Sequence, residues 1–132
     1  MSGPLLDRID IHVDVPAVKY RDLAGTQSGE CSAMIRERVA RARELQLRRF
    51  AGPGGARCNA DLEGTMIREF CPTDQVGSEL LRAAVSRLGL SARAYNRILK
   101  VARTIADLSS SDSIRPEHIS EAIQYRSLGR IL

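Results

Sequence analysis

The sequence contains no tryptophan, and aromatic residues make up only 4% of its 132 residues. β-Sandwiches and barrels rely on aromatic and β-branched residues that pack across strands, so this shortage argues against them. Hydrophobic residues still account for 43% of the chain, and the core must therefore be built mainly from Leu, Ile, Val and Ala. The composition favours packed helices in one domain, at a size where a core needs no covalent support.

Cysteine is also scarce. Cys31, Cys58 and Cys71 are odd in number and widely spaced, and no C-x-x-C motif occurs. This pattern argues against a disulfide framework or a zinc site, and it predicts free thiols in a reducing cytoplasm. No apolar run reaches the roughly 18 residues that span a bilayer, and no signal peptide is recognisable. We therefore expect a cytoplasmic protein with no membrane partner.

Lysine is nearly absent, since Lys19 and Lys100 are the only two and all other basic residues are arginine. The formal net charge is +4, which allows contact with phosphate without requiring it. Arginine presents a planar fork that holds phosphate or carboxylate at two points. A general compositional bias toward arginine explains the same observation equally well.

The N-terminal part of the chain contains one strand pattern. Residues 9–15 (IDIHVDV) alternate apolar and polar side chains, which predicts a half-buried strand that Pro16 ends. A strand without partners is not stable in water. Residues 9–15 therefore either belong to a sheet outside this chain or form no strand within it. The Gly- and Ser-containing residues 17–30 are expected to be a linker.

The rest of the sequence predicts a mainly α fold. The expected helices cover residues 32–50, 63–71, 74–88, 91–108 and a last segment that begins at Pro116. Thr73 and Ser91 are expected to cap helix N-termini, and Gly89 to close the helix that ends before it. The residues expected on buried faces are Ile35, Val39, Ala42, Gln46 and Phe50 in helix 32–50, and Val76, Leu80, Ala84 and Leu88 in helix 74–88. Helix 32–50 should turn its arginines, Arg49 included, toward solvent.

Arg8 is the first candidate functional residue. It follows a small-residue turn and directly precedes the predicted strand, so it could project from the end of a sheet. There it could reach a phosphoryl group held by a neighbouring subunit, a contact that accelerates phosphoryl transfer roughly 10³–10⁵-fold in other nucleotidases. The alternative is a surface ion pair with Asp7 or Asp10.

Arg93 is the second candidate. It lies in the first turn of the helix that Ser91 caps, where free backbone N–H groups and the helix dipole favour an anion such as phosphate. Arg97 and Lys100 follow at helical spacing and define a possible nucleic-acid or lid surface. The alternative is a solvated outer face without a ligand.

No catalytic constellation is recognisable in the remaining sequence. His12 and His118 are expected at the surface. No geometric argument supports a catalytic pair of carboxylates such as Asp107 and Asp112. The Gly-rich turn at residues 51–56 lacks the lysine and the leading strand of a P-loop. Neither hydrolysis by this chain alone nor a metal site is expected.

Three stretches of the sequence resemble magnesium-chelatase-like AAA+ ATPases. They are SGPLLDRIDIHV (residues 2–13), GLSARAYNRILKVARTIADL (residues 89–108) and IRPEHISEAIQYR (residues 114–126). The resemblance extends from residue 2 to about residue 128. Long motifs in this order and at this separation are hard to obtain by chance.

The resemblance implies a role for each part of the chain. Arg8 matches the arginine finger, which acts in trans on ATP bound by the next subunit. Arg93 matches the sensor-2 arginine, which contacts the nucleotide from a helical lid. The fold implied is a C-terminal AAA+ lid bundle preceded by an orphan core strand and a connector helix. Its implied parts are a poorly ordered remnant of the ATPase core (1–30), the connector helix and turn (31–59), and the lid (60–132).

The resemblance also implies partners that lie outside this sequence. The complete protein would bind ATP and Mg²⁺, assemble with its own ATPase core into a homo-hexamer, and move DNA during recombination and competence. No Walker A or Walker B motif occurs here, so the chain alone is expected to be inactive and to bind no cofactor, and Met1 is expected to be an artificial start. The alternatives are an ATPase subunit that serves porphyrin metallation, and a non-enzymatic basic helical DNA-binding domain.

Overall fold

The computed structural model describes residues 3–26 and 29–131, with the side chains of residues 4–26 and 29–126. Within these residues the chain is mainly helical and contains no named strand, which confirms the predicted fold class. The helices are α1 (Gly3–Leu6), α2 (Tyr20–Ala24), α3 (Ser32–Arg49), the 3₁₀ turn η1 (Asn59–Asp61), α4 (Thr65–Phe70), α5 (Gln75–Leu88), α6 (Ala92–Leu108) and α7 (Pro116–Ile131). None of them has both the length and the apolar character that crossing a membrane requires.

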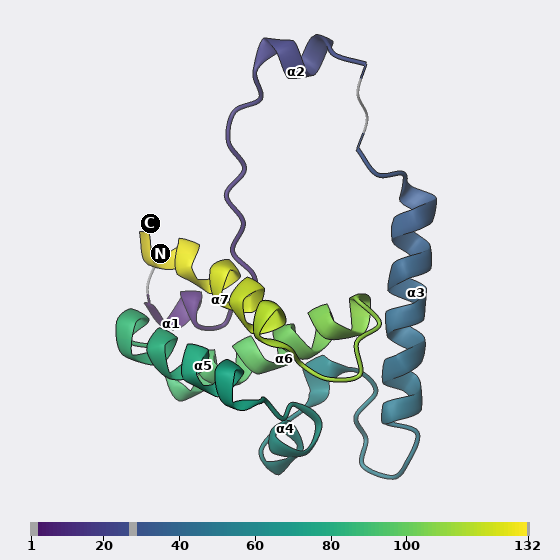
Figure 1. The fold of residues 1–132 in the computed structure, drawn as a ribbon, viewed down its shortest axis with the longest axis vertical. Helices are drawn as coiled ribbons and strands as arrows, with labels where there is room; N and C mark the ends of the chain where they lie inside the picture. The colour runs from purple at the N-terminus through teal and green to yellow at the C-terminus, as the bar shows by residue number, and fades with distance from the viewer. Residues whose placement is uncertain (1–2, 27–28, 132) are drawn as a thin grey trace.

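Helix α6 is the centre of the bundle. It packs against α7, α3, η1 and α4, while α5 packs on α7 (Figure 1). Its inward face is apolar at helical spacing, with Ile98, Ala102 and Ala106 fully buried. The main core cluster consists of Leu62, Ile67, Cys71, Leu81, Ile98, Leu99, Ala102, Ala106, Ile114, Ile119 and Ala122. No aromatic side chain belongs to this cluster, as the composition predicts.

Two of the predicted helix ends are confirmed and one is wrong. Ser91 Oγ accepts a hydrogen bond from the Ala94 N–H at 3.1 Å, and Gly89 closes α5 at φ +60°. Helix α5, however, is capped by Asp74, whose Oδ1 accepts from the Gly77 N–H at 2.7 Å. Thr73 instead bonds to Ser78 through its hydroxyl group. An Asp at the capping position satisfies a free backbone donor better than a Thr one residue earlier.

The predicted buried face of α5 is confirmed at Ala84, which is buried, and is wrong at Val76. Leu81 is 2% exposed and belongs to the core, whereas Val76 is 56% exposed. Gly77 is buried in the first turn, where an added Cβ would lie only 3.1 Å from the capping oxygen Asp74 Oδ1 but at ordinary contact distance, 3.6 Å, from Cγ1 of Ile119 in α7. The small residue therefore leaves room for the Asp74 cap.

Helix α3 stands beside the bundle and touches it only in part (Figure 1). Ala42 and Gln46 are buried as expected, but Ile35 and Val39 remain exposed because no element covers the N-terminal part of the helix. Arg49, which was expected to face solvent, points into the protein instead. The helix predicted at residues 32–50 is confirmed, and its role as a connector stays a prediction.

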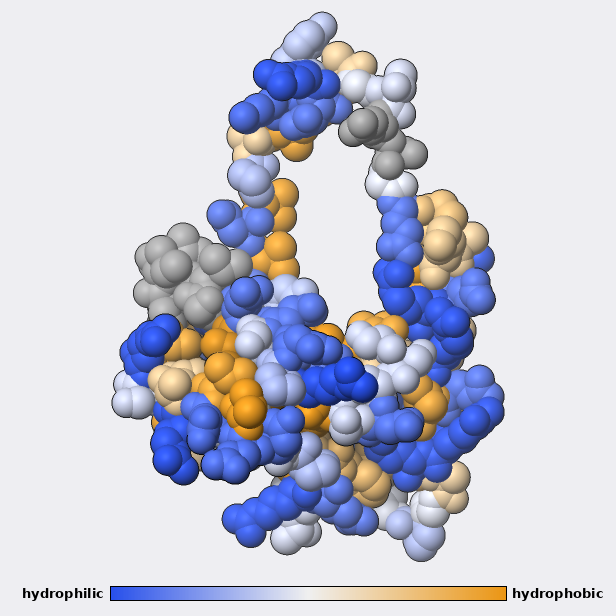
Figure 2. Space-filling model, in the orientation of Figure 1, coloured by the Kyte–Doolittle hydropathy of each residue, from blue (hydrophilic) through white to orange (hydrophobic). Residues whose placement is uncertain are grey.

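Residues 9–15 do not form the predicted strand. They are extended, and the described part of the chain offers no second strand to supply backbone partners, apart from an isolated bridge between Thr73 and Ile114. The chain runs away from the bundle here and returns through α2 to the start of α3 (Figure 1). Figure 2 shows hydrophobic residues along this arm, and Ile11, Val13, Val15 and Val18 are all exposed on it. The proposed domain limits and the poor order of residues 1–30 stay predictions, and residues 1–2, 27–28 and 132 lie outside the described residues.

Candidate functional site

Arg8 lies in the turn that ends α1. Its N–H donates to the Leu5 carbonyl at 3.1 Å, and the Ile9 N–H donates to the Leu6 carbonyl at 3.1 Å. The Arg8 side chain is exposed, and none of its described neighbours forms an ion pair with it. The carboxylates that the sequence offered as partners, Asp7 and Asp10, are engaged elsewhere. The turn therefore leaves the Arg8 guanidinium available to a group outside the chain.

Asp7 and Asp10 both bond to the helical bundle. Ser91 Oγ donates to Asp7 Oδ2 at 3.0 Å, and Asp7 Oδ1 lies 3.6 Å from Nη2 of Arg126 in α7. Asp10 forms an ion pair with Arg97 in α6. The residues on either side of Arg8 are thus attached to the helices, while Arg8 itself is not.

Arg93 is the second residue of α6 and is exposed. Its position in the first turn is fixed by the Ser91 cap, and it faces a groove of about 310 Å³ between α6 and the start of α4. The groove is lined by Leu62, Glu63, Gly64, Ile67, Arg93, Asn96, Arg97 and Lys100. Three cations and one carboxylate therefore share this groove, which gives it a positive character suited to an anion.

The structure places Arg97 and Lys100 in the same groove but gives each an internal partner. Arg97 pairs with Asp10, and Lys100 Nζ donates to the Ala60 carbonyl at 3.1 Å. Of the three groove cations, Arg93 has no such bond among the described residues. The groove thus combines one exposed guanidinium with two cations that hold neighbouring segments in place.

Arg8 and Arg93 come to the same end of the bundle. Asp7 directly precedes Arg8, and Ser91 lies two residues before Arg93. The side chains of Asp7 and Ser91 are hydrogen-bonded to each other. No direct contact joins the two arginines in the described structure. Two exposed guanidiniums at one helix N-terminus can attract polyanionic groups such as phosphates.

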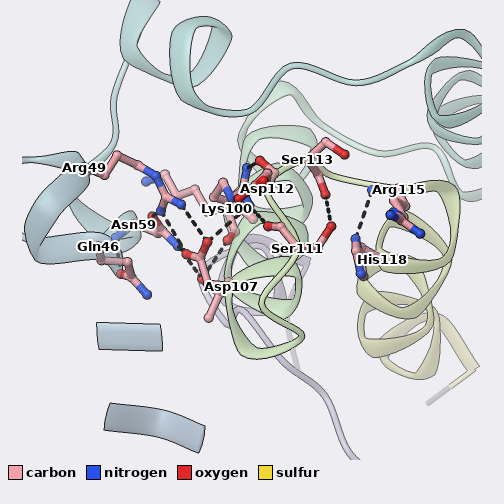
Figure 3. Close-up of polar contacts among 12 residues, drawn as sticks. Gln46, Arg49, Asn59, Lys100, Asp107, Ser111, Asp112, Ser113, Arg115 and His118 are labelled. Carbon is pink, nitrogen blue, oxygen red and sulfur yellow. Dashed lines mark hydrogen bonds and ion pairs between the residues drawn. The ribbon is translucent and has the colours of Figure 1, made fainter. Parts of the chain in front are cut away.

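A buried polar network that the sequence did not predict joins α3 to α6. Asp107 is 1% exposed and accepts hydrogen bonds from Nη2 of Arg49 at 2.6 Å and Nη1 at 2.9 Å. Arg103 Nη2 lies 3.2 Å from the same carboxylate, and Asn59 Nδ2 donates to it at 2.9 Å. The Asn59 N–H in turn donates to Gln46 Oε1 at 2.8 Å (Figure 3). A carboxylate with several donors around it can remain ionised although it is buried.

The buried groups in and near this network have altered acidities. The hydrogen bonds to Asp107 raise the pKa of Arg49, whereas burial lowers the pKa of Arg103. Burial also raises the pKa of the neighbouring Cys71 thiol to about 11. The Arg49 and Arg103 shifts belong to a packed interior at the C-terminal end of α6, whereas Cys71 lines a pocket with Asn96 and Leu99, nearer to Arg93.

His118 was expected at the surface and is buried. Its Nδ1 accepts a hydrogen bond from the Arg115 N–H at 2.9 Å, so the side chain caps the start of α7 (Figure 3). His12 is half-buried, and both of its ring nitrogens are buried without a hydrogen-bond partner within the described residues. Neither histidine lies in a group of side chains that could hold a metal ion, as far as the structure describes the chain.

Comparison with known proteins identifies the family to which this chain belongs. The family described as "Magnesium chelatase, subunit ChlI C-terminal" matches residues 29–126, which is most of the chain. The chain belongs to this family, and its resemblance to magnesium-chelatase-like AAA+ ATPases is confirmed.

Individual relatives add detail. The chain is 41% identical over its whole length to the "Competence protein ComM" of Haemophilus influenzae and to the "Uncharacterized protein YifB" of Escherichia coli. It is 34% identical over 98% of its length to an uncharacterized protein of Mycobacterium tuberculosis. In each case it spans only 25% of the relative's length.

Proposed function

We propose that the chain is the C-terminal lid portion of an oligomeric AAA+ ATPase, in which Arg8 is the arginine finger and Arg93 is the sensor-2 arginine. The observation that carries this proposal is the position of Arg8. Its guanidinium is exposed, and both nearby carboxylates are bonded to α6 and α7 instead. A finger that acts in trans must be held by its own subunit and still be free to reach a phosphate on the next one.

Arg93 supports the same proposal. It lies at the positive end of the α6 dipole and lines the groove against α4, and both features favour contact with a nucleotide phosphate. ATP and Mg²⁺ belong to the complete protein in this proposal, and each guanidinium suits a phosphate, Arg8 on the ATP of the next subunit and Arg93 on the ATP beneath its own lid. Among the described residues, no group of three or more acidic, histidine or cysteine side chains could hold a metal ion.

The work done by the ATPase is proposed from its relatives. The name of the Haemophilus relative favours a role in competence. We propose that this role is DNA remodelling in branch migration, performed by a homo-hexamer in the cytoplasm. The description of the matched family favours an alternative, an ATPase subunit of magnesium chelatase in porphyrin metallation. In either ATPase, Arg97 and Lys100 would hold neighbouring segments of the lid in place through Asp10 and the Ala60 carbonyl. A stand-alone DNA-binding domain has less support, because Arg38 and Arg48 of α3 already pair with Glu30 and Glu44.

The test is the ATPase activity of the full-length protein with Arg8→Ala. We expect hydrolysis to fall about 10³-fold or more, while ATP binding changes little, because a finger contributes mainly in the transition state. Arg87→Ala is the matched control, since Arg87 is an exposed arginine on α5, away from the groove. Normal hydrolysis by the Arg8→Ala protein would contradict the finger assignment.

A further inference from the structure

The N-terminal segment is attached to the bundle by contacts that bracket Arg8. On one side, Asp7 bonds to Ser91 and lies beside Arg126. On the other side, Asp10 pairs with Arg97. The partners on α6 are 84 and 87 residues away in the sequence, so these are tertiary contacts and not local turns.

Backbone contacts extend the attachment beyond the ion pairs. Arg126 donates to the Ile9 carbonyl, and the His12 N–H donates to the Tyr125 carbonyl at 2.8 Å. The Arg126 side chain is only 4% exposed, and Asp7 supplies a negative charge beside it. A buried guanidinium depends strongly on such partners, because an uncompensated charge is costly inside a protein.

We propose that Asp7, Asp10, Ser91, Arg97 and Arg126 form a latch that fixes the segment carrying Arg8 onto the helix carrying Arg93, so that the two arginines move as one body. Asp7 and Asp10 are positioning residues in this proposal. They hold the backbone on both sides of Arg8 and leave its side chain exposed. Its role in hydrolysis rests on the proposed function, whereas the latch itself does not.

The latch gives the lid a direct mechanical connection to the finger. Ser91 caps α6 and also bonds to Asp7, so a rotation of α6 that follows contact at Arg93 displaces the backbone at Arg8. An exposed guanidinium on an untethered arm would have to be ordered in each catalytic cycle. Fixing the arm in advance removes that entropic cost from the reaction.

The first test measures hydrogen exchange in the 132-residue chain. Asp10→Asn should accelerate exchange at the His12 amide about fivefold, the effect of losing one partly exposed ion pair that holds the segment. Asp14→Asn is the matched control, because Asp14 lies on the same arm, is exposed and has no ion pair among the described residues. The charge-swapped double variant, Asp10→Arg with Arg97→Asp, should restore slow hydrogen exchange at the His12 amide. Equal exchange in the wild-type and Asp10→Asn chains would overturn the latch.

The second test measures ATP hydrolysis by the full-length protein. Asp10→Asn should lower kcat about 10-fold and leave KM for ATP nearly unchanged, because a displaced finger weakens the transition state and not substrate binding. The charge-swapped double variant should recover most of kcat, which a purely structural role of Asp10 would not predict. A normal kcat for Asp10→Asn, beside an inactive Arg8→Ala protein, would overturn the positioning role. Full activity of Arg8→Ala would instead remove the finger assignment, and the latch would then be decided by hydrogen exchange alone.

Discussion

Arg49 and Asp107 are 58 residues apart in the sequence and form a two-point ion pair, with N–O distances of 2.6 and 2.9 Å. The pair fastens the end of α3 to the end of α6. Arg103 Nη2 lies 3.2 Å from Oδ1 of the same carboxylate, the oxygen that Arg49 Nη2 also contacts. The contact between α3 and α6 therefore includes one buried carboxylate shared by two guanidiniums.

Removing this anion should destabilise the protein strongly. Asp107→Ala leaves Arg49 and Arg103 without their countercharge, and we expect the free energy of unfolding to fall by about 3–5 kcal/mol. Urea denaturation measures the change. Asp112→Ala is the control, since Asp112 is exposed and offers only its backbone carbonyl to Arg103. A loss below about 1 kcal/mol for Asp107→Ala would show that the network contributes little.

The Cys71 thiol predicts a dependence of stability on alkaline pH. Burial raises its pKa from 9.0 to about 11, so the folded protein holds this proton more tightly than the unfolded chain does. The neutral thiol makes its full contribution to the free energy of unfolding below about pH 9. This contribution, roughly 2–3 kcal/mol, is lost as the pH rises toward about 11.

The measurement is urea denaturation at several values of pH between 8 and 11, for the wild type and for Cys71→Ala. For each protein, the free energy of unfolding is compared with its own value at pH 8. This comparison removes the constant cost of the cavity that Cys71→Ala leaves. The variant should show a smaller loss with rising pH. Parallel curves for the two proteins would contradict a buried, neutral thiol.

The helix end at Gly89 predicts a backbone effect without loss of a side-chain contact. Gly89 has φ +60°, and an L side chain in this conformation costs about 1–2 kcal/mol. Gly89→Ala should lower the free energy of unfolding by about this amount. Gly52→Ala is the control, because Gly52 has neither a positive φ nor a neighbouring atom within 4 Å of an added Cβ. Equal effects of the two substitutions would argue against the left-handed cap.

His12 predicts that a substitution can strengthen the attachment of the N-terminal segment. Both ring nitrogens are buried without a hydrogen-bond partner among the described residues, which is unfavourable for polar atoms. His12→Phe keeps a planar ring and removes the polar atoms, so exchange at the amides of residues 9–12 should slow. His12→Asn, which keeps two polar atoms and loses most of the ring's packing area, should accelerate it. Slower exchange in His12→Asn than in His12→Phe would contradict the buried position of the ring.

Local sequence signals predicted the helices because they act over three or four residues. Ser91 accepts a hydrogen bond from a backbone N–H three residues later, and the left-handed conformation of Gly89 depends only on that residue. Composition and periodicity likewise predicted the mainly α fold. The burial of Leu81 was missed because apolar residues stand at both positions 80 and 81, so periodicity fits two orientations. The packing of α5 against α7, which selects one of them, is a tertiary effect.

The candidate site was predicted only where a family motif or a helix end marked it. Arg8 and Arg93 were found in this way, but their roles stay predictions. The links from Asp7 to Ser91 and from Arg49 to Asp107 join residues 84 and 58 positions apart. No local pattern selects such partners. The four-residue spacing of Arg103 and Asp107 was the one signal in the sequence that could have indicated a buried pair.

The central claim, that Arg8 serves a neighbouring subunit, is tested most directly by complementation between two inactive full-length variants. One carries Arg8→Ala, and the other carries a substitution of the phosphate-binding lysine that the family implies outside this chain. In mixed assemblies, an intact Arg8 can reach an intact nucleotide site across the subunit boundary. We predict that mixing restores part of the ATPase activity. Assemblies that mix fully and remain inactive would contradict a finger that acts in trans.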